Sequence, residues 1–185
     1  MKIPSLISGT LAVLLFLGSY QLKSRKNIIF CNTLSRILYI LQYILLGEFI
    51  GAVMDISAIP SSVLAEKKEN PIVKRYRIPI IIAVNFLIVA LGAAFWENAL
   101  SLLPIFGVLF ETVALWFSRE RTVRLMSLLG APFWLSYNLI CGAYASAIGN
   151  VLTIISILTA LYRYRTVKCE KSAEPINNLE REEKI

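Results

Sequence analysis

The stretch LMSLLGAPFWLSYNLICGAYASAIGNVLTIISILTALY, from Leu125 to Tyr162, contains no Asp, Glu, Lys or Arg and is closed by Arg124 and Arg163. At a helical rise of about 1.5 Å per residue, one helix of this length is roughly 57 Å long, almost twice a hydrocarbon core of about 30 Å. Glycine permits the backbone angles of a tight turn. We therefore predict a transmembrane hairpin that turns near Cys141-Gly142-Ala143.

The composition of the whole chain agrees with a membrane protein. Of its 185 residues, 57% are hydrophobic and only 17% are charged, and the mean hydropathy is +0.66. Soluble domains are less apolar. The formal net charge is +7, but the basic residues lie between apolar segments, where they set topology, so we expect lipid and no nucleic acid as a partner.

The sequence lacks the residues on which most catalysis and metal binding depend. It has no histidine, which is the commonest general base and a frequent metal ligand. Its cysteines, Cys31, Cys141 and Cys169, are far apart and have no metal-ligand spacing. We expect no enzyme, no metal and no cofactor, because an intramembrane enzyme needs a nucleophile and a base that are not evident here.

Five further apolar segments precede the hairpin, and each is about as long as a membrane-spanning helix. They cover residues 3–22, 27–47, 49–65, 78–96 and 99–118. Asn70-Pro71 lies in the basic connection between the third and the fourth, where proline does not easily continue a helix. With the hairpin, this gives seven predicted spans. Lys2 before an apolar run imitates a signal peptide, but no Ala-x-Ala-like site follows, so we favour an uncleaved first span.

The basic residues alternate between the connections. The second, fourth and sixth connections contain no Lys or Arg. The first, third and fifth connections and the C-terminal side contain Lys23, Arg25 and Lys26, then Lys67, Lys68, Lys74, Arg75 and Arg77, then Arg119, Arg121 and Arg124, then Arg163 and Arg165. Since basic connections remain in the cytoplasm, the N-terminus is predicted outside and the C-terminus inside.

A shift of 95 residues superimposes the third span on the seventh. It pairs Asp55 with Asn150 and sets Tyr39, Gln42 and Tyr43 opposite Trp134, Tyr137 and Asn138. The identical pairs are Gly47 with Gly142, Ala52 with Ala147, Ile59 with Ile154, Ser61 with Ser156 and Ala65 with Ala160. This predicts an all-α, 3+1+3 arrangement of two parallel three-helix repeats. The first repeat is 1–66, the basic loop and linker helix 67–98, the second repeat 99–165, and 166–185 a disordered cytoplasmic tail.

These residues carry a resemblance to known carriers. The 3+1+3 plan, with Asp55 and Asn150 early in the third helix of each unit, resembles the SWEET, PQ-loop and PnuC group. The run Tyr137-Asn138-x-x-x-Gly142-Ala143 with Asn150 downstream is similar to the YgjV-type bacterial inner-membrane family, over roughly residues 5–165. The resemblance implies a carrier fold in the bacterial inner (plasma) membrane with an unassigned solute. The chain departs from the SWEET pattern in lacking a Pro-Gln dipeptide and in having Asp55 where a symmetric carrier has a second Asn.

Polar side chains at membrane depth are costly and generally face the interior of a helix bundle. We expect a small polar solute, such as a sugar, a nucleoside or a vitamin, to be bound by Asp55, Asn138, Asn150, Tyr137, Trp134 and Gln42. For the two asparagines we favour this role. For the aromatic residues Trp134 and Tyr137 we favour the alternative, in which they anchor the protein at the membrane interface or serve as packing residues.

Two charged residues in predicted spans, Arg36 and Glu111, are interpreted as structural or coupling charges. Counted from the turn at Gly47-Glu48, Arg36 and Asp55 differ in depth by roughly 5 Å, so an ion pair between them is predicted. Alternatively, Arg36 reaches the cytoplasmic face and Asp55 lines an aqueous vestibule. Buried Glu111 suits proton coupling, but a hydrogen bond to a neighbouring helix or a pair with Arg36 explains it equally well.

The sequence thus predicts a small-solute transporter that works by alternating access between two three-helix units, and it leaves room for a homo-oligomer. The alternative is a non-transporting membrane scaffold or receptor-like bundle whose repeat only builds a stable fold. A central cavity lined by the polar residues favours transport, whereas a tightly packed bundle favours the alternative.

Overall fold

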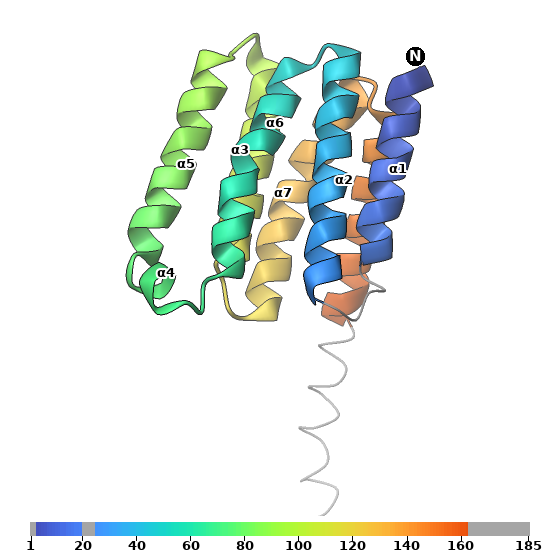
Figure 1. The fold of residues 1–185 in the computed structure, drawn as a ribbon. Helices are drawn as coiled ribbons and strands as arrows, with labels where there is room; N and C mark the ends of the chain where they lie inside the picture. Colours follow the sequence, from blue (N-terminus) through green and yellow to red (C-terminus); the bar gives the residue numbers. More distant parts are fainter. Residues whose placement is uncertain (1–2, 20–24, 163–185) are drawn as a thin grey trace, which may run out of the picture.

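The computed structural model describes residues 3–19 and 25–162, which form helices and turns without a strand. The long helices are α1 (Ile3–Ser19), α2 (Arg25–Leu46), α3 (Phe49–Glu66), α5 (Arg77–Ala94), α6 (Leu102–Leu115) and α7 (Glu120–Ile140), followed by a last helix, Tyr144–Tyr162. Two short helices, α4 (Pro71–Arg75) and the 3-10 helix η1 (Ala99–Ser101), lie between them. The predicted all-α class is confirmed for this part of the chain (Figure 1). The predicted tail, 166–185, lies outside the described residues.

Each predicted apolar segment contains one long helix, and the hairpin turns where the sequence predicted. Gly142 has a φ of 76° and Gly47, in the turn between α2 and α3, a φ of 86°, which is the left-handed region that favours glycine. As predicted, Asn70-Pro71 does not continue the preceding helix, since α3 ends at Glu66. Asn70-Pro71 begins a helix, because the Asn70 side chain accepts a hydrogen bond from Ile72 N at 3.0 Å and proline fits the first helical position.

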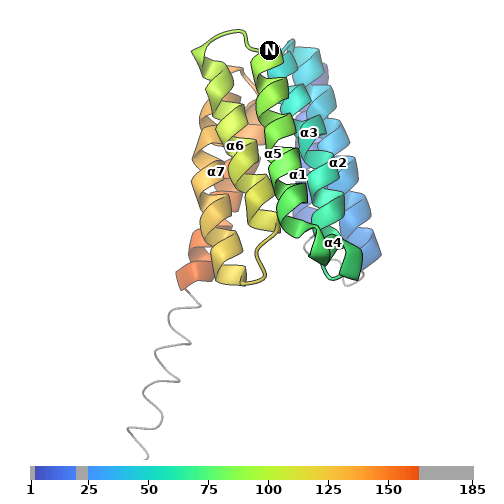
Figure 2. The same cartoon turned by 90° about the vertical axis from the view of Figure 1, so that its left-hand side faces the viewer.

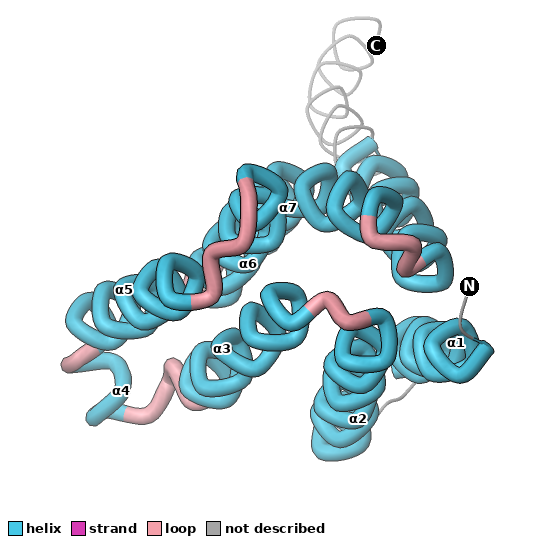
Figure 3. Tube along the Cα trace, turned by 90° about the horizontal axis from the view of Figure 1, so that it is seen from above, coloured by secondary structure: helices cyan, strands magenta, loops and turns pink. Residues whose placement is uncertain are grey.

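Seen from above, the helices lie in two rows, with α1, α2 and α3 in one and α6, α7 and the last helix in the other (Figure 3). At one end of the rows α5 packs against both α3 and α6 (Figure 2). At the other end the last helix meets α1, where a Cβ on Gly149 would lie 2.8 Å from Val13 Cγ2. The turns after α2 and α5 lie at the same end of the bundle as the start of α1, and the connections after α3 and α6 lie at the opposite end (Figure 1).

The apolar and polar residues are distributed as expected for helices in lipid. On α5, Ile82 and Phe86 are exposed, while Val84, Ile88 and Gly92 are buried. The interior contains many polar residues, which a bundle in lipid needs to shield. By length and composition, the helices Arg77–Ala94 and Tyr144–Tyr162 are each able to cross a membrane. The apolar parts of the other helices are shorter and comprise Ile3–Gly18, Thr33–Leu46, Phe49–Ala65 and Ala99–Leu115.

Close packing of α6 on α7 gives a first prediction. A Cβ on Gly107 would lie 2.8 Å from Trp134 Cδ1, whereas a Cβ on Gly18 meets nothing within 4 Å. Overpacking a rigid ring costs about 1–3 kcal/mol. Gly107→Ala is therefore expected to lower the thermal stability of the detergent-purified protein, measured by loss of the monodisperse peak on size-exclusion chromatography after heating. Gly18→Ala is the matched control, because both residues are helical, and equal stability of the two variants would contradict the packing argument.

Candidate functional site

Three charged side chains meet between α2, α3 and α6. The Arg36 guanidinium donates from Nη1 to Asp55 Oδ1 at 3.1 Å and from Nη2 to Glu111 Oε1 at 2.5 Å. The exposed fractions of the side chains are 19% for Arg36, 10% for Asp55 and 38% for Glu111. The predicted pair between Arg36 and Asp55 is therefore confirmed, and Arg36 does not extend to the cytoplasmic face instead. Glu111 also pairs with Arg36, which is one of the three interpretations that the sequence left open.

This charged cluster lies well inside the bundle. At a rise of about 1.5 Å per residue, Asp55 is roughly 12 Å from the turn at Gly47 and Arg36 roughly 16 Å from it. Glu111 is roughly 18 Å along the chain from Ala99, at the same end. These distances are about half of a hydrocarbon core of about 30 Å.

A second polar cluster joins the two rows of helices. The Tyr43 hydroxyl donates to Asn138 Oδ1 at 2.7 Å, and these two residues are 95 positions apart in the chain. The Ser146 hydroxyl donates to Gln42 Oε1 at 2.5 Å, and the Gly51 backbone N–H donates to the Tyr137 hydroxyl at 3.1 Å. All three contacts are buried and each links a residue of α2 or α3 to a residue of α7 or the last helix.

These contacts follow the 95-residue register found in the sequence. Under the shift, Gln42 corresponds to Tyr137 and Gly51 corresponds to Ser146. The contact of Gln42 with Ser146 therefore corresponds to the contact of Tyr137 with Gly51. Tyr43 contacts its own counterpart, Asn138. A register derived from five identities is thus repeated in the pattern of three-dimensional contacts.

The crossing of the first two helices in each row obeys the same register. The Ser35 hydroxyl donates to the Ala12 carbonyl at 2.7 Å, where α2 crosses α1. The shifted residues are Gly130 and Gly107, and a Cβ on Gly130 would lie 3.0 Å from the Gly107 carbonyl oxygen. The two crossings therefore occur at equivalent residues. A hydroxyl hydrogen bond joins α1 and α2 at the first crossing, whereas the backbones of α6 and α7 approach closely at the second.

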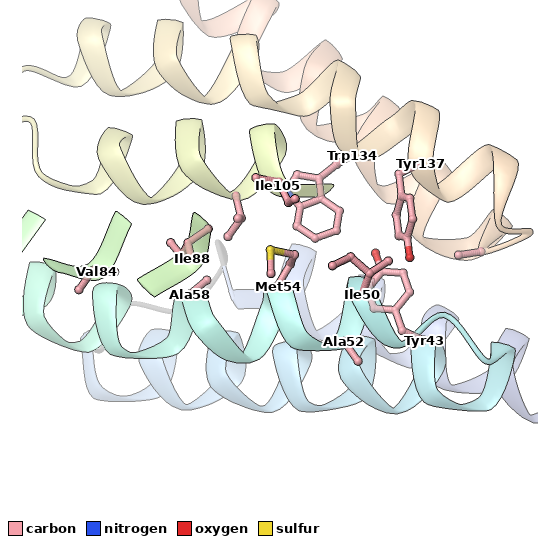
Figure 4. Close-up of a cluster of buried hydrophobic side chains, with 12 residues drawn as sticks. Tyr43, Ile50, Ala52, Met54, Ala58, Val84, Ile88, Ile105, Trp134 and Tyr137 are labelled. Carbon is pink, nitrogen blue, oxygen red and sulfur yellow. The ribbon is translucent and has the colours of Figure 1, made fainter. Parts of the chain in front are cut away.

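Aromatic rings surround the Tyr43 contact. The Trp134 ring lies 6.2 Å from Tyr43 and 6.2 Å from Tyr137, and Tyr43 lies 5.9 Å from Tyr137, between ring centroids. Figure 4 shows Trp134 and Tyr137 directed from α7 toward Tyr43, Ile50 and Met54. Trp134 is 8% exposed, and its Nε1 is buried without a hydrogen-bond partner. Burial at this depth favours a role in the interior over anchoring at the membrane interface.

The predicted solute-binding residues do not form one continuous group. Asn138, Tyr137 and Trp134 lie together, and Gln42 is bonded to Ser146 nearby. Asp55 belongs to the charged cluster, and no hydrogen bond among the described residues joins it to Asn138 or Asn150. The Asn150 side chain is half-buried, and its Nδ2 has no hydrogen-bond partner.

A pocket of about 100 Å³ opens at the end of the bundle that contains the turns after α2 and α5. Of the predicted site residues it contacts Tyr137, whose hydroxyl also donates to Glu48 Oε2 at 3.2 Å. The pocket is also lined by Glu48, Ile50, Glu97, Asn98, Leu100, Ser101, Ile140 and Cys141. Sequence reasoning missed Glu48 because a glutamate beside a tight turn is typical of an interface. The signal available was that the connections without Lys or Arg contain Glu48 and Glu97.

Among residues 3–19 and 25–162, no three His, Cys, Asp or Glu side chains are grouped closely enough to hold a metal ion. In comparisons with known proteins, the sequence model of a family described as bacterial inner membrane protein, Imp-YgjV, matches residues 5–168. Searches of curated proteins and of solved structures returned no match.

Proposed function

Because the chain belongs to the Imp-YgjV family of bacterial inner membrane proteins, we propose that it is a small-solute transporter of the inner membrane. In this proposal the seven long helices cross the bilayer in a 3+1+3 arrangement. Residues 1–66 and 99–165 form two parallel three-helix units, and α5 is the linker. This is the arrangement implied by the resemblance of the sequence to the SWEET, PQ-loop and PnuC carriers.

The observation that carries this proposal is the set of contacts in the 95-residue register. Two parallel repeats are related by an axis along the membrane normal, and carriers with such repeats bind their solute where the repeats meet. A residue that touches its own counterpart lies on that axis, as Tyr43 and Asn138 do. The paired contacts of Gln42 and Tyr137 lie on either side of it.

The proposed orientation is with the N-terminus outside and the C-terminus in the cytoplasm. Arg75, Arg77, Arg119 and Arg121 belong to connections at one end of the bundle, and the turns at the other end contain Glu48 and Glu97. The positive-inside rule assigns the basic end to the cytoplasm. The pocket beside Tyr137 then faces the outside of the cell.

Transport in this scheme occurs by rocking of the two units about the Tyr43 and Asn138 contact. A polar solute bound there replaces the hydrogen bonds that the two units now make to each other, so the interface loses little free energy when it opens. The rings of Tyr43, Trp134 and Tyr137 provide flat surfaces for a sugar or a base. The Trp134 N–H is buried without an acceptor and is therefore available to donate a hydrogen bond to the solute.

The decisive experiment is net uptake by proteoliposomes that contain the purified protein, screened over sugars, nucleosides, vitamins and amino acids. Protein-free liposomes and liposomes with the protein denatured before reconstitution are the controls. Uptake of one solute above both controls supports the proposal. Absence of uptake across the screen, with protein shown to be folded and inserted, favours the scaffold or receptor-like alternative.

Once a solute is found, the Tyr43 and Asn138 contact gives a second prediction. The double variant Tyr43→Phe/Asn138→Leu removes both partners without leaving a buried polar group unpaired, so it is expected to fold. Its rate of uptake is expected to fall at least tenfold, because the donor and acceptor on the axis are lost. Ser136→Ala, at an exposed position on α7, is the control and should transport normally. Normal uptake by the double variant would contradict a role for Tyr43 and Asn138 in binding the solute.

A further inference from the structure

The pocket beside Tyr137 lies where the two proposed units meet, and the inference drawn from it rests on the proposed function. Glu48 and Ile50, at the start of α3 in the first unit, form one side of the pocket. Tyr137 and Cys141, at the end of α7 in the second unit, form another side. Any movement of one unit against the other therefore changes the shape of this pocket.

The charge of the pocket is negative. Glu48 and Glu97 line it, and none of the described residues that line it is Lys or Arg. Within residues 3–19 and 25–162, the ion pairs are those of Arg36, so neither glutamate of the pocket is neutralised by a basic side chain there. Two carboxylates at one small pocket attract a cation and repel an anion.

The common plan of the two units does not require these two acids. The 95-residue shift pairs Glu48 with Ala143, which is fully buried, and Glu97 with Lys2. The corresponding sequence positions therefore contain neither carboxylate. Since the corresponding helices form without these acids, the fold does not account for Glu48 and Glu97, and a role in binding does.

The turn that contains Glu97 is held in a fixed shape by its own hydrogen bonds. Asn98 Oδ1 accepts a hydrogen bond from Leu100 N at 2.8 Å. The Ser101 hydroxyl oxygen accepts hydrogen bonds from Glu97 N at 3.3 Å and from Asn98 N at 3.4 Å. This side of the pocket is thus formed before a ligand arrives, which lowers the entropy cost of binding.

Tyr137 joins the pocket to the contact on the axis between the repeats. Its hydroxyl donates to Glu48 Oε2 at 3.2 Å, and its ring centroid lies 5.9 Å from that of Tyr43. The face of a tyrosine ring attracts a cation, and so does the carboxylate beside it. One aromatic ring therefore separates a cation in the pocket from Tyr43 and its partner Asn138.

We propose that this pocket binds the ammonium group of a cationic solute, which then passes to the contact between Tyr43 and Asn138. At about 100 Å³ the pocket suits one ammonium head group, because pockets for whole ligands measure about 300–1,000 Å³. A metal ion fits less well, because no three His, Cys, Asp or Glu side chains among the described residues are grouped closely enough to hold one. The proposed solute is thus a small molecule with a positive charge.

The thiol of Cys141 permits a test that does not require the solute, because this residue lines the pocket. The full chain with Cys31→Ala and Cys169→Ala is reconstituted in lipid nanodiscs at low ionic strength. Cys141 is then modified with a positively or a negatively charged methanethiosulfonate, and the mass of the intact protein gives the rate. Burial raises the pKa of this thiol to about 11, so the reaction is followed at mildly alkaline pH, where more thiolate is present.

After division by the rates with a small free thiol, the positively charged reagent is expected to react about 100-fold faster than the negatively charged one. One unit charge about 6 Å away in water changes the local concentration of each reagent roughly threefold, in opposite directions, so each glutamate contributes about tenfold. Glu48→Gln should therefore lower the ratio about tenfold, while its amide oxygen still accepts from Tyr137. Glu69→Gln, at an exposed carboxylate outside the pocket, is the matched control and should leave the ratio unchanged.

Binding is measured as protection of Cys141 from an uncharged methanethiosulfonate. Choline and ethanolamine are the cationic probes, and the neutral probe is the isostere of choline in which a tert-butyl group replaces the trimethylammonium group. At least one cation should slow the modification in a saturable manner, and the neutral isostere should not. The double variant Glu48→Gln/Glu97→Gln should lose this protection.

Protection by neither cation, equal protection by the neutral isostere, or protection that survives the double variant overturns the proposed cation site. A ratio of the two charged reagents that is unaffected by Glu48→Gln overturns it as well. Uptake of a neutral solute without protection of Cys141 would leave the transporter and reject the cation site. Protection without uptake of any solute would leave a cation-binding pocket and reject transport, so the two proposals fail separately.

Discussion

Replacement of Arg36 by alanine is expected to remove most of the folded protein from the membrane. Asp55 and Glu111 then remain between α2, α3 and α6 without the guanidinium that both contact. Removing one partner of a buried ion pair costs about 3–5 kcal/mol, which is a large part of the stability of a typical domain. The measurement is the amount of monodisperse protein extracted from membranes in mild detergent, detected by a C-terminal fluorescent fusion.

The charge-free triple variant, Arg36→Ala/Asp55→Asn/Glu111→Gln, separates loss of charge balance from loss of packing. It leaves no ionised group in the cluster, so it is expected to recover most of the protein that Arg36→Ala loses. Arg121→Ala, at an exposed position on α7, is the control for removal of a positive charge and should have little effect. If the triple variant yields as little monodisperse protein as Arg36→Ala, the loss is due to missing packing of the arginine stem and not to the unpaired carboxylates.

A covalent bridge between the two units is expected to reduce uptake to the level of protein-free liposomes. Gln42 and Ser146 are suitable positions, because their side chains meet at 2.5 Å between Oε1 and Oγ across the unit interface. Both are changed to cysteine in a background without Cys31, Cys141 and Cys169, and a short bifunctional methanethiosulfonate joins them. In the proposed mechanism the two units separate at this contact, so a bridge is expected to stop uptake and a reductant to restore it.

The matched control is a bridge of the same kind inside one unit. Ala12 and Ser35 approach at the crossing of α1 with α2, where the Ser35 hydroxyl lies 2.7 Å from the Ala12 carbonyl. Both belong to the first unit, so Ala12→Cys/Ser35→Cys should transport normally after bridging. Equal inhibition by the two bridges, or normal uptake with the bridge between Gln42 and Ser146, would contradict movement of one unit against the other.

The sequence was sufficient for the helices because their signals are local. Charge-free runs, the turn glycines Gly47 and Gly142 and the basic connections each act within a few residues, and the seven long helices lie where these signals place them. The pair of Arg36 with Asp55 was also accessible, since both flank one tight turn and counting residues gives their relative depth. Local counting works within a hairpin, where the connection fixes the register.

The contacts between the two rows of helices could not be predicted from the sequence in this way. The choice of Glu111 as the second partner of Arg36 depends on how α6 packs beside α2 and α3, and the sequence left this open. Tyr43 entered the repeat comparison but not the predicted site, because a tyrosine in an apolar helix is compatible with ordinary packing. The 95-residue shift pairs Tyr43 with Asn138, but the contact between these two counterparts is seen only in the structure.

The hydrogen bond between Tyr43 and Asn138 also bears on how such a chain arises. If an ancestral protein consisted of one three-helix unit that assembled as a homodimer, this position placed a side chain opposite an identical copy of itself. Two identical residues on a twofold axis must each serve as donor and as acceptor. Joining the copies in one chain through a linker helix removes that constraint, and the two positions now differ, with a phenol as donor and an amide as acceptor. In a chain fused in this way, the centre of the molecule can become asymmetric while the helices around it keep a common plan.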